Sequence, residues 1–84
     1  MEENGLAVIA ILAHSDEAAA ILNTILHEYS EWIIGRMGLP YREKNIRLIS
    51  VALDAPRSIV SSLSGKIGKI PGVSARAVSS FDKK

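Results

Sequence analysis

The chain has 84 residues, of which 48% are hydrophobic and 23% charged, with no cysteine and a formal net charge of +1. This length predicts one domain over residues 1–84. A domain this small has a modest core, and without cysteine it has no disulfide or thiolate metal cluster to stabilise it, so self-association is expected. The longest apolar run, residues 6–13, is far too short to span a bilayer and excludes a membrane-spanning helix.

Charge is distributed unevenly along the chain. Residues 1–42 carry six acids and two bases, whereas residues 43–84 carry three acids and eight bases. Opposite charges of this kind favour attraction within the domain or between copies. A sequence pI near 8.1 is low for a dedicated nucleic-acid-binding protein, so direct nucleic acid binding is not expected. The sequence lacks cysteine, and it also lacks a secretory leader, in which a basic segment is followed by an apolar one. Both features predict a cytoplasmic protein.

The first half of the chain predicts a strand, a helix and a hairpin. Residues 5–13 form a short apolar run, typical of a strand covered on both faces. From Asp16 to Tyr29, apolar residues recur at helical spacing, with acidic residues in the first turn. Residues 31–37 predict a second strand, residues 38–45 a turn rich in glycine, proline and polar residues, and residues 46–53 a third strand that pairs with the second.

The second half predicts a helix and a final strand. Asp54-Ala55-Pro56 is typical of a helix start, with Asp54 as the capping carboxylate and Pro56 in the first turn. Gly68 and the Pro71-Gly72 pair end this helix, and residues 73–79 predict the last strand. One face of the helix is marked by Ile59, Val60, Leu63, Ile67 and Ile70.

The element order βαββαβ predicts an α+β fold of the ferredoxin-like type. In this sandwich a four-stranded antiparallel sheet, in the order 4-1-3-2, carries two helices on one face and leaves the other face bare. The first strand is apolar on both of its faces, so the set that does not meet the helices needs another cover. We therefore expect a partner on the sheet, most economically another copy, in a dimer or a tetramer.

Two segments carry a resemblance to a known family. Gly35-Arg36-Met37-Gly38-Leu39-Pro40-Tyr41-Arg42-Glu43 and Gly65-Lys66-Ile67-Gly68-Lys69-Ile70-Pro71-Gly72-Val73 resemble the small proteins called iron-only hydrogenase system regulators. The resemblance covers most of the chain and implies an ACT-like domain, similar in fold to the ligand-sensing C-terminal domain of nickel-responsive repressors. ACT domains usually bind small effectors, often amino acids, at interfaces between copies.

The resemblance implies a small-molecule-sensing regulatory domain of an iron-only hydrogenase system that acts as a homo-oligomer and signals to a protein partner. The alternative is a structural module without a ligand, whose sheet recruits other proteins. Nickel repressors use a histidine-rich site with a cysteine ligand. This chain has no cysteine and only His14 and His27, so a nickel site does not carry over.

The predicted topology brings three segments to one edge of the sheet: the end of the first strand, the hairpin and the Pro71-Gly72 turn. Free N–H groups at the start of the first helix suit a carboxylate or a phosphate, and Arg36 or Arg42 adds positive charge. For each residue taken singly, a capping or solvated role is the favoured interpretation. The candidate ligand-binding residues are His14, Ser15, Asp16, Arg36, Tyr41, Arg42 and Gly72.

No pattern in the chain predicts catalysis or a metal site. A Walker phosphate loop, a nucleophile elbow, a His-Glu-x-x-His pair and a glycine-rich dinucleotide motif are all missing from the sequence. His14 and His27 lie near opposite ends of the predicted helix, roughly 20 Å apart, so they cannot share a metal ion within one chain. We expect neither an enzyme, nor a cofactor, nor a metal.

Overall fold

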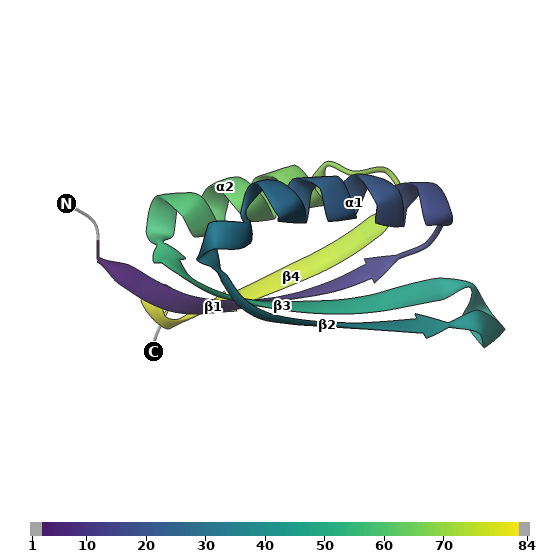
Figure 1. Cartoon of the computed structure of the whole chain (residues 1–84), viewed down its shortest axis with the longest axis horizontal. Helices are drawn as coiled ribbons and strands as arrows, with labels where there is room; N and C mark the ends of the chain where they lie inside the picture. Colours follow the sequence, from purple (N-terminus) through teal and green to yellow (C-terminus); the bar gives the residue numbers. More distant parts are fainter. Residues whose placement is uncertain (1–2, 83–84) are drawn as a thin grey trace.

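A computed structural model describes residues 3–82. The strands are β1 (Asn4–Ala13), β2 (Ile33–Tyr41), β3 (Ile46–Pro56) and β4 (Val73–Ser79), and the helices are α1 (Asp16–Glu28) and α2 (Arg57–Gly68). Single turns of 3-10 helix follow α1, β2 and β4, at Ser30–Trp32, Arg42–Lys44 and Ser80–Asp82. The predicted order βαββαβ is confirmed, and both helices lie on the same side of the sheet (Figure 1).

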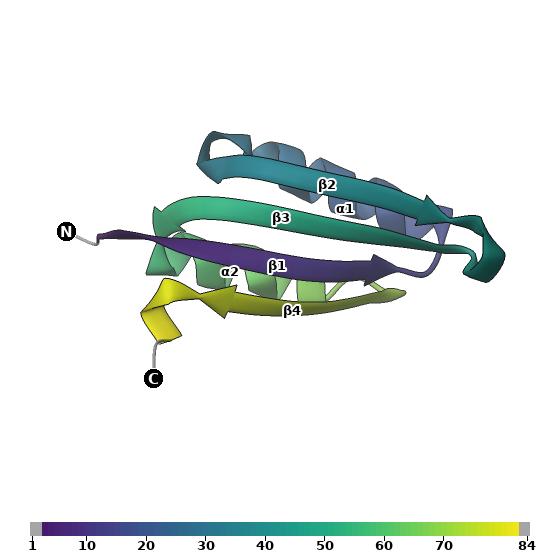
Figure 2. The ribbon, with the colours of Figure 1, turned by 90° about the horizontal axis from the view of Figure 1, so that it is seen from below.

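The sheet has four strands in the order β2-β3-β1-β4, and every neighbouring pair is antiparallel. This is the predicted order read from the other end. The long central strands β1 and β3 pair from Asn4 opposite Pro56 to Ala13 opposite Arg47, and β2 and β4 form the edges. Figure 2 views the sheet from the side opposite the helices, where no other element of residues 3–82 covers the strands.

The core lies between the helices and one face of the sheet. Along β1 the side chains alternate strictly, with Ala7, Ile9, Ile11 and Ala13 buried under the helices. The side chains between them point to the opposite face, as expected for a period of two. The helices contribute Ala18, Ala19, Leu22, Leu26, Val60, Leu63 and Ile67 to this core, and β3 contributes Ile49, Val51, Leu53 and Ala55.

The β2–β3 hairpin differs from the prediction at both ends. Strand β2 begins only at Ile33, because residues 30–32 form a 3-10 turn, and it continues through Gly38 and Pro40 to Tyr41. The reversal is confined to residues 42–45, where Asn45 adopts a left-handed conformation with φ of 58°. The predicted turn over 38–45 was wrong in its first half because β2 is an edge strand, where proline is tolerated.

Asp54 does not cap α2. Strand β3 runs on to Pro56, which is the N-terminal cap of α2 and makes no side-chain capping bond, and Asp54 instead pairs opposite Leu6 of β1. The predicted capping role of Asp54 is therefore wrong. Because β1 extends to Asn4, opposite Pro56, the pairing of these two strands continues past the point where the local Asp-Ala-Pro pattern predicted a helix.

Candidate functional site

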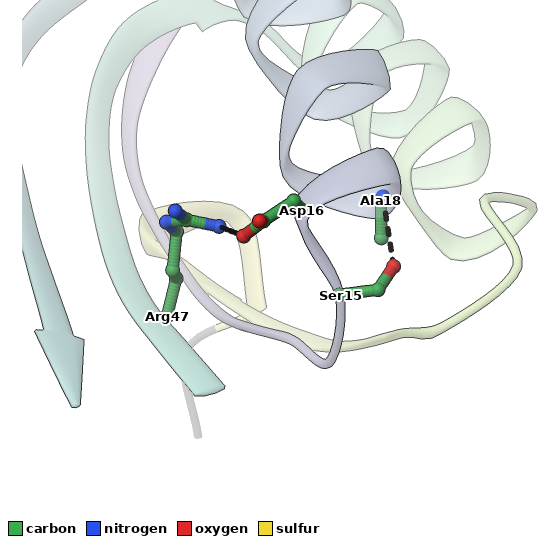
Figure 3. A network of polar contacts seen from close by, with 4 residues as sticks. All are labelled: Ser15, Asp16, Ala18 and Arg47. Carbon is green, nitrogen blue, oxygen red and sulfur yellow. Dashed lines mark hydrogen bonds and ion pairs between the residues drawn. The ribbon is translucent and has the colours of Figure 1, made fainter. Parts of the chain in front are cut away.

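The corner between β1 and α1 brings three of the predicted site residues together. The Ser15 hydroxyl accepts a hydrogen bond from the Ala18 N–H at 3.0 Å and caps α1 (Figure 3). The His14 N–H donates to the Gly72 carbonyl at 2.8 Å, which ties the end of β1 to the turn before β4. The His14 ring nitrogen Nε2 lies 3.4 Å from the Ser74 hydroxyl.

Asp16 forms an ion pair with Arg47, whose guanidinium Nη1 donates to Asp16 Oδ1 (Figure 3). The sequence predicted that Arg36 or Arg42 adds positive charge at the start of this helix, and it did not predict a role for Arg47. Arg47 lies on the helix side of β3, opposite Ala13, and so reaches the start of α1 directly. Since the Asp16 side chain is 90% exposed, the pair contributes about 1 kcal/mol at most to stability, and it positions two charges near the helix start.

Arg36 lies away from the start of α1. Its guanidinium donates to the Asn23 side-chain oxygen at 2.8 Å, on the second half of the helix. A β-bulge between Ile33 and Gly35 sets the register of β2, and Arg36 is thereby paired opposite Val51 on the helix side of the sheet. The structure therefore brings His14, Ser15, Asp16, Gly72, Tyr41 and Arg42 to one end of the sheet and leaves Arg36 outside this group.

A pocket of about 240 Å³ lies between the hairpin and the start of α1. Its charged side chains are Asp16, Arg42 and Arg47, with formal charges of −1, +1 and +1, so the pocket carries one net positive charge. Such a site suits a small anion. The Tyr41 hydroxyl donates to Glu43 Oε1 at 2.5 Å, and this hydrogen bond raises the pKa of Tyr41. The other lining residues are Pro40, Tyr41, Asn45 and Ile46.

The uncovered side of the sheet, which we call the open face, is strongly apolar. Seven of the nine exposed large apolar residues among residues 3–82 project from it, with exposures between 38% and 73%. They are Leu6, Val8, Leu12, Met37, Leu39, Tyr41 and Val78. Contiguous apolar surfaces larger than a few hundred Å² are rare on monomeric soluble proteins in general. The doubly apolar first strand predicted this property, and the structure extends it to β2 and β4.

The centre of the open face is hollowed. A depression of about 540 Å³ forms where the central strands carry the small residues Ala10 and Ser50, between larger side chains on either side. Its rim includes Leu12, Met37, Leu48, Ser74 and Arg76. The sequence analysis missed Ser74 and Arg76 as candidate residues. Their alternation with Val73, Ala75 and Ala77 in the last strand is the signal that places them on the open face.

Two further observations concern metals and membranes. Over residues 3–82, no three histidine, aspartate or glutamate side chains gather closely enough to hold a metal ion. In the same part of the chain, neither helix is long and apolar enough to cross a membrane.

Two solved structures are similar to this chain over nearly its whole length. The structure of an uncharacterized protein, TM1266 from Thermotoga maritima, is similar at 33% identity and a TM-score of 0.89, over 93% of this chain and 99% of that one. The C-terminal domain of the MgtC protein from Mycobacterium tuberculosis is similar with a TM-score of 0.72 and 10% identity, over 100% of this chain and 96% of that one. The two domains therefore share the fold. None of the curated proteins matches.

The family comparison confirms the resemblance found in the sequence. The model of the TM1266-like family, whose description is that of a proposed iron-only hydrogenase system regulator, matches residues 5–77. That range runs from the start of β1 almost to the end of β4. The chain therefore belongs to the TM1266-like iron-only hydrogenase system regulator family.

Proposed function

We propose that this protein is a cytoplasmic regulatory domain that acts as a homo-oligomer, joined through the open face, within an iron-only hydrogenase system. The apolar open face is the observation that carries the proposal. Its seven large apolar side chains face water in a single copy, whereas the helix side of the same sheet is already covered. The family supplies the regulatory context, and the absence of cysteine supports the location.

The exposed area of the open face is large enough to offset much of the cost of association. Full burial of a Leu, Val or Met side chain is worth about 1.5–3 kcal/mol relative to exposure. Because the seven side chains are already about half covered, burying the remainder is worth roughly 1 kcal/mol each, or on the order of 14 kcal/mol for two copies. Association costs an estimated 4–15 kcal/mol in lost freedom of motion. The gain from covering two open faces is therefore of the same size as the cost of assembly.

Replacement of Val8 by Asp tests the role of the open face. Val8 and Ile21 are both 47% exposed, but Val8 projects from the open face and Ile21 lies on α1. We expect V8D to convert the protein to a monomer, because burying the new carboxylate against an apolar surface is costly. The matched variant I21D should keep the assembly of the wild type. Sedimentation velocity over a range of concentrations measures both.

Circular dichroism spectra of V8D and I21D establish that each variant is folded before the comparison is made. A wild-type protein that sediments as a monomer at every concentration contradicts the proposal. So does a V8D variant that assembles as tightly as I21D.

Sensing of a small anion at the hairpin pocket is the second part of the proposal. The hairpin connects two surfaces: Arg42 lines the pocket, and Tyr41 projects from the neighbouring open face. An anion held by Arg42 near the start of α1 would favour one arrangement of the hairpin and thereby one arrangement of the paired copies. Its effect on the free energy of assembly equals the difference between its binding free energies for the two arrangements.

Native mass spectrometry of protein purified without a tag tests the sensing role. We expect the wild type to retain a small molecule as extra mass, and the variant D16A/R42A to lose it. The matched control is R36A, because Arg36 bonds to Asn23 outside the pocket and its loss should leave the extra mass in place. Equal retention by D16A/R42A places the ligand elsewhere. A wild type without extra mass that small anions fail to stabilise thermally favours the alternative, a protein-recruiting module without a ligand.

A further inference from the structure

The open face carries one acidic and one basic side chain among residues 3–82. Asp54 projects from β3 opposite Leu6, and Arg76 projects from β4 opposite Ala10. Both side chains are exposed, and neither forms an ion pair or a hydrogen bond within the described part of the chain. The residues that lie between Asp54 and Arg76 on the open face are apolar, or small and uncharged. These two charges are therefore the main polar groups that a covering partner must accommodate.

Asp54 and Arg76 cannot reach each other within one copy. Their β1 partners, Leu6 and Ala10, are four residues apart, which is about 13 Å along the strand, and β3 and β4 are separated by about 10 Å across the sheet. The Cα atoms are thus roughly 16 Å apart. This separation exceeds the combined reach of an arginine and an aspartate side chain. If the open face is covered, each charge must find a partner on the covering molecule or remain buried without one, which is costly.

A second copy of the chain supplies both partners at the required spacing. In an isologous interface, residue i of one copy meets residue j of the other, and residue j meets residue i. One acid and one base on the same face are therefore satisfied together by a single two-fold axis. Any other protein would need a base and an acid at this same separation, on an apolar surface of matching shape.

We propose that two copies pair open face to open face, in a register that places Asp54 of each copy against Arg76 of the other. The proposal rests on the self-association described above and adds its geometry. The midpoint between the two charges falls at Val8 of β1, so Val8 lies at the two-fold axis and faces its own counterpart. Arg76 borders the depression together with Ser74 and Ser50, so an incoming carboxylate meets a guanidinium with neighbouring hydroxyl groups in an otherwise apolar setting.

Charge reversal tests this register. The variants D54R and R76D each place like charges in contact twice in a homodimer, and each should self-associate at least about 10-fold more weakly than the wild type. In an equimolar mixture, the D54R copy presents two bases and the R76D copy two acids, so both contacts of a heterodimer again join opposite charges. We expect this heterodimer to form with near wild-type affinity, and native mass spectrometry identifies it by its mass. The matched control E17R, an acid-to-base reversal on α1, should leave self-association unchanged.

The outcomes separate the register from the self-association on which it depends. A wild type that remains monomeric overturns both. A wild type that assembles while D54R and R76D assemble equally well, or while their mixture gives no heterodimer, overturns the register alone. The neutral variants D54N and R76Q supply a second measurement if a reversed charge prevents folding. In them we expect weaker pairing than in the wild type, and unchanged pairing in both also overturns the register.

Discussion

Replacement of Leu63 by Ala is expected to lower the free energy of unfolding by about 2–5 kcal/mol, because it leaves a cavity in the core. Leu63 is fully buried, on the face of α2 that packs against the sheet. Domains of this size have total stabilities of about 5–15 kcal/mol, so the loss is a large part of the whole. It corresponds to a fall in Tm of about 10 °C or more. Urea unfolding followed by circular dichroism measures the change.

Ile21 provides the matched control for Leu63. It is also a branched aliphatic residue on a helix, but it is 47% exposed. Ile21→Ala should change the free energy of unfolding by no more than about 1 kcal/mol, because little packing is lost and alanine favours the helix. Both variants must be measured at one protein concentration, since the proposed self-association would add to apparent stability. Similar losses in the two variants would contradict the assignment of the core.

Two glycines near the end of α2 should respond to alanine with opposite signs. Gly72 has a φ of +82°, in the left-handed region, and an added Cβ would lie 3.5 Å from the Ala18 Cβ, at ordinary contact distance. The expected loss of about 1–2 kcal/mol in G72A therefore comes from the backbone conformation. Because the Gly72 carbonyl accepts a hydrogen bond from the His14 N–H, a change in the Gly72 backbone also affects the end of β1.

Gly65 lies inside α2, and an added Cβ there would meet nothing within 4 Å. G65A should raise the free energy of unfolding by up to about 1 kcal/mol, because alanine restricts the unfolded chain and favours the helix. Thermal unfolding of the two variants beside the wild type tests the difference in sign. Stabilisation by G72A, or destabilisation by G65A, would show that the backbone near one of these residues differs from the structure.

The elements that depend on periodic patterns could be predicted from the sequence. The helical spacing after Asp16 and the alternation within residues 73–79 each identified an element whose start agrees with the structure. The apolar character of both faces of the first strand predicted the open face. These predictions succeeded because the burial of alternate or helically spaced side chains leaves a direct trace in the order of residues.

Features that depend on pairing between distant strands could not be predicted. Asp54, followed by Ala55 and Pro56, has the local chemistry of a helix cap, but continued pairing of β3 with β1 keeps it in a strand. The partner of Asp16 is Arg47, because Arg47 lies opposite Ala13 at the end of β1. Arg36 faces Asn23 because a bulge near Ile34 sets its register. Nothing in the residues adjacent to these side chains records the register of the sheet.

The two edges of the sheet have different consequences for larger assemblies. Every fibre built through the edges of the sheet needs a contact at the β2 edge as well as at the β4 edge, because pairing at one edge alone stops at two copies. Pro40 provides no N–H in β2, and the bulge between Ile33 and Gly35 interrupts the regular spacing of its backbone groups. Such an edge is a poor template for an incoming strand. The irregular edge of β2 thus disfavours runaway polymerisation through strand addition at the edges of the sheet.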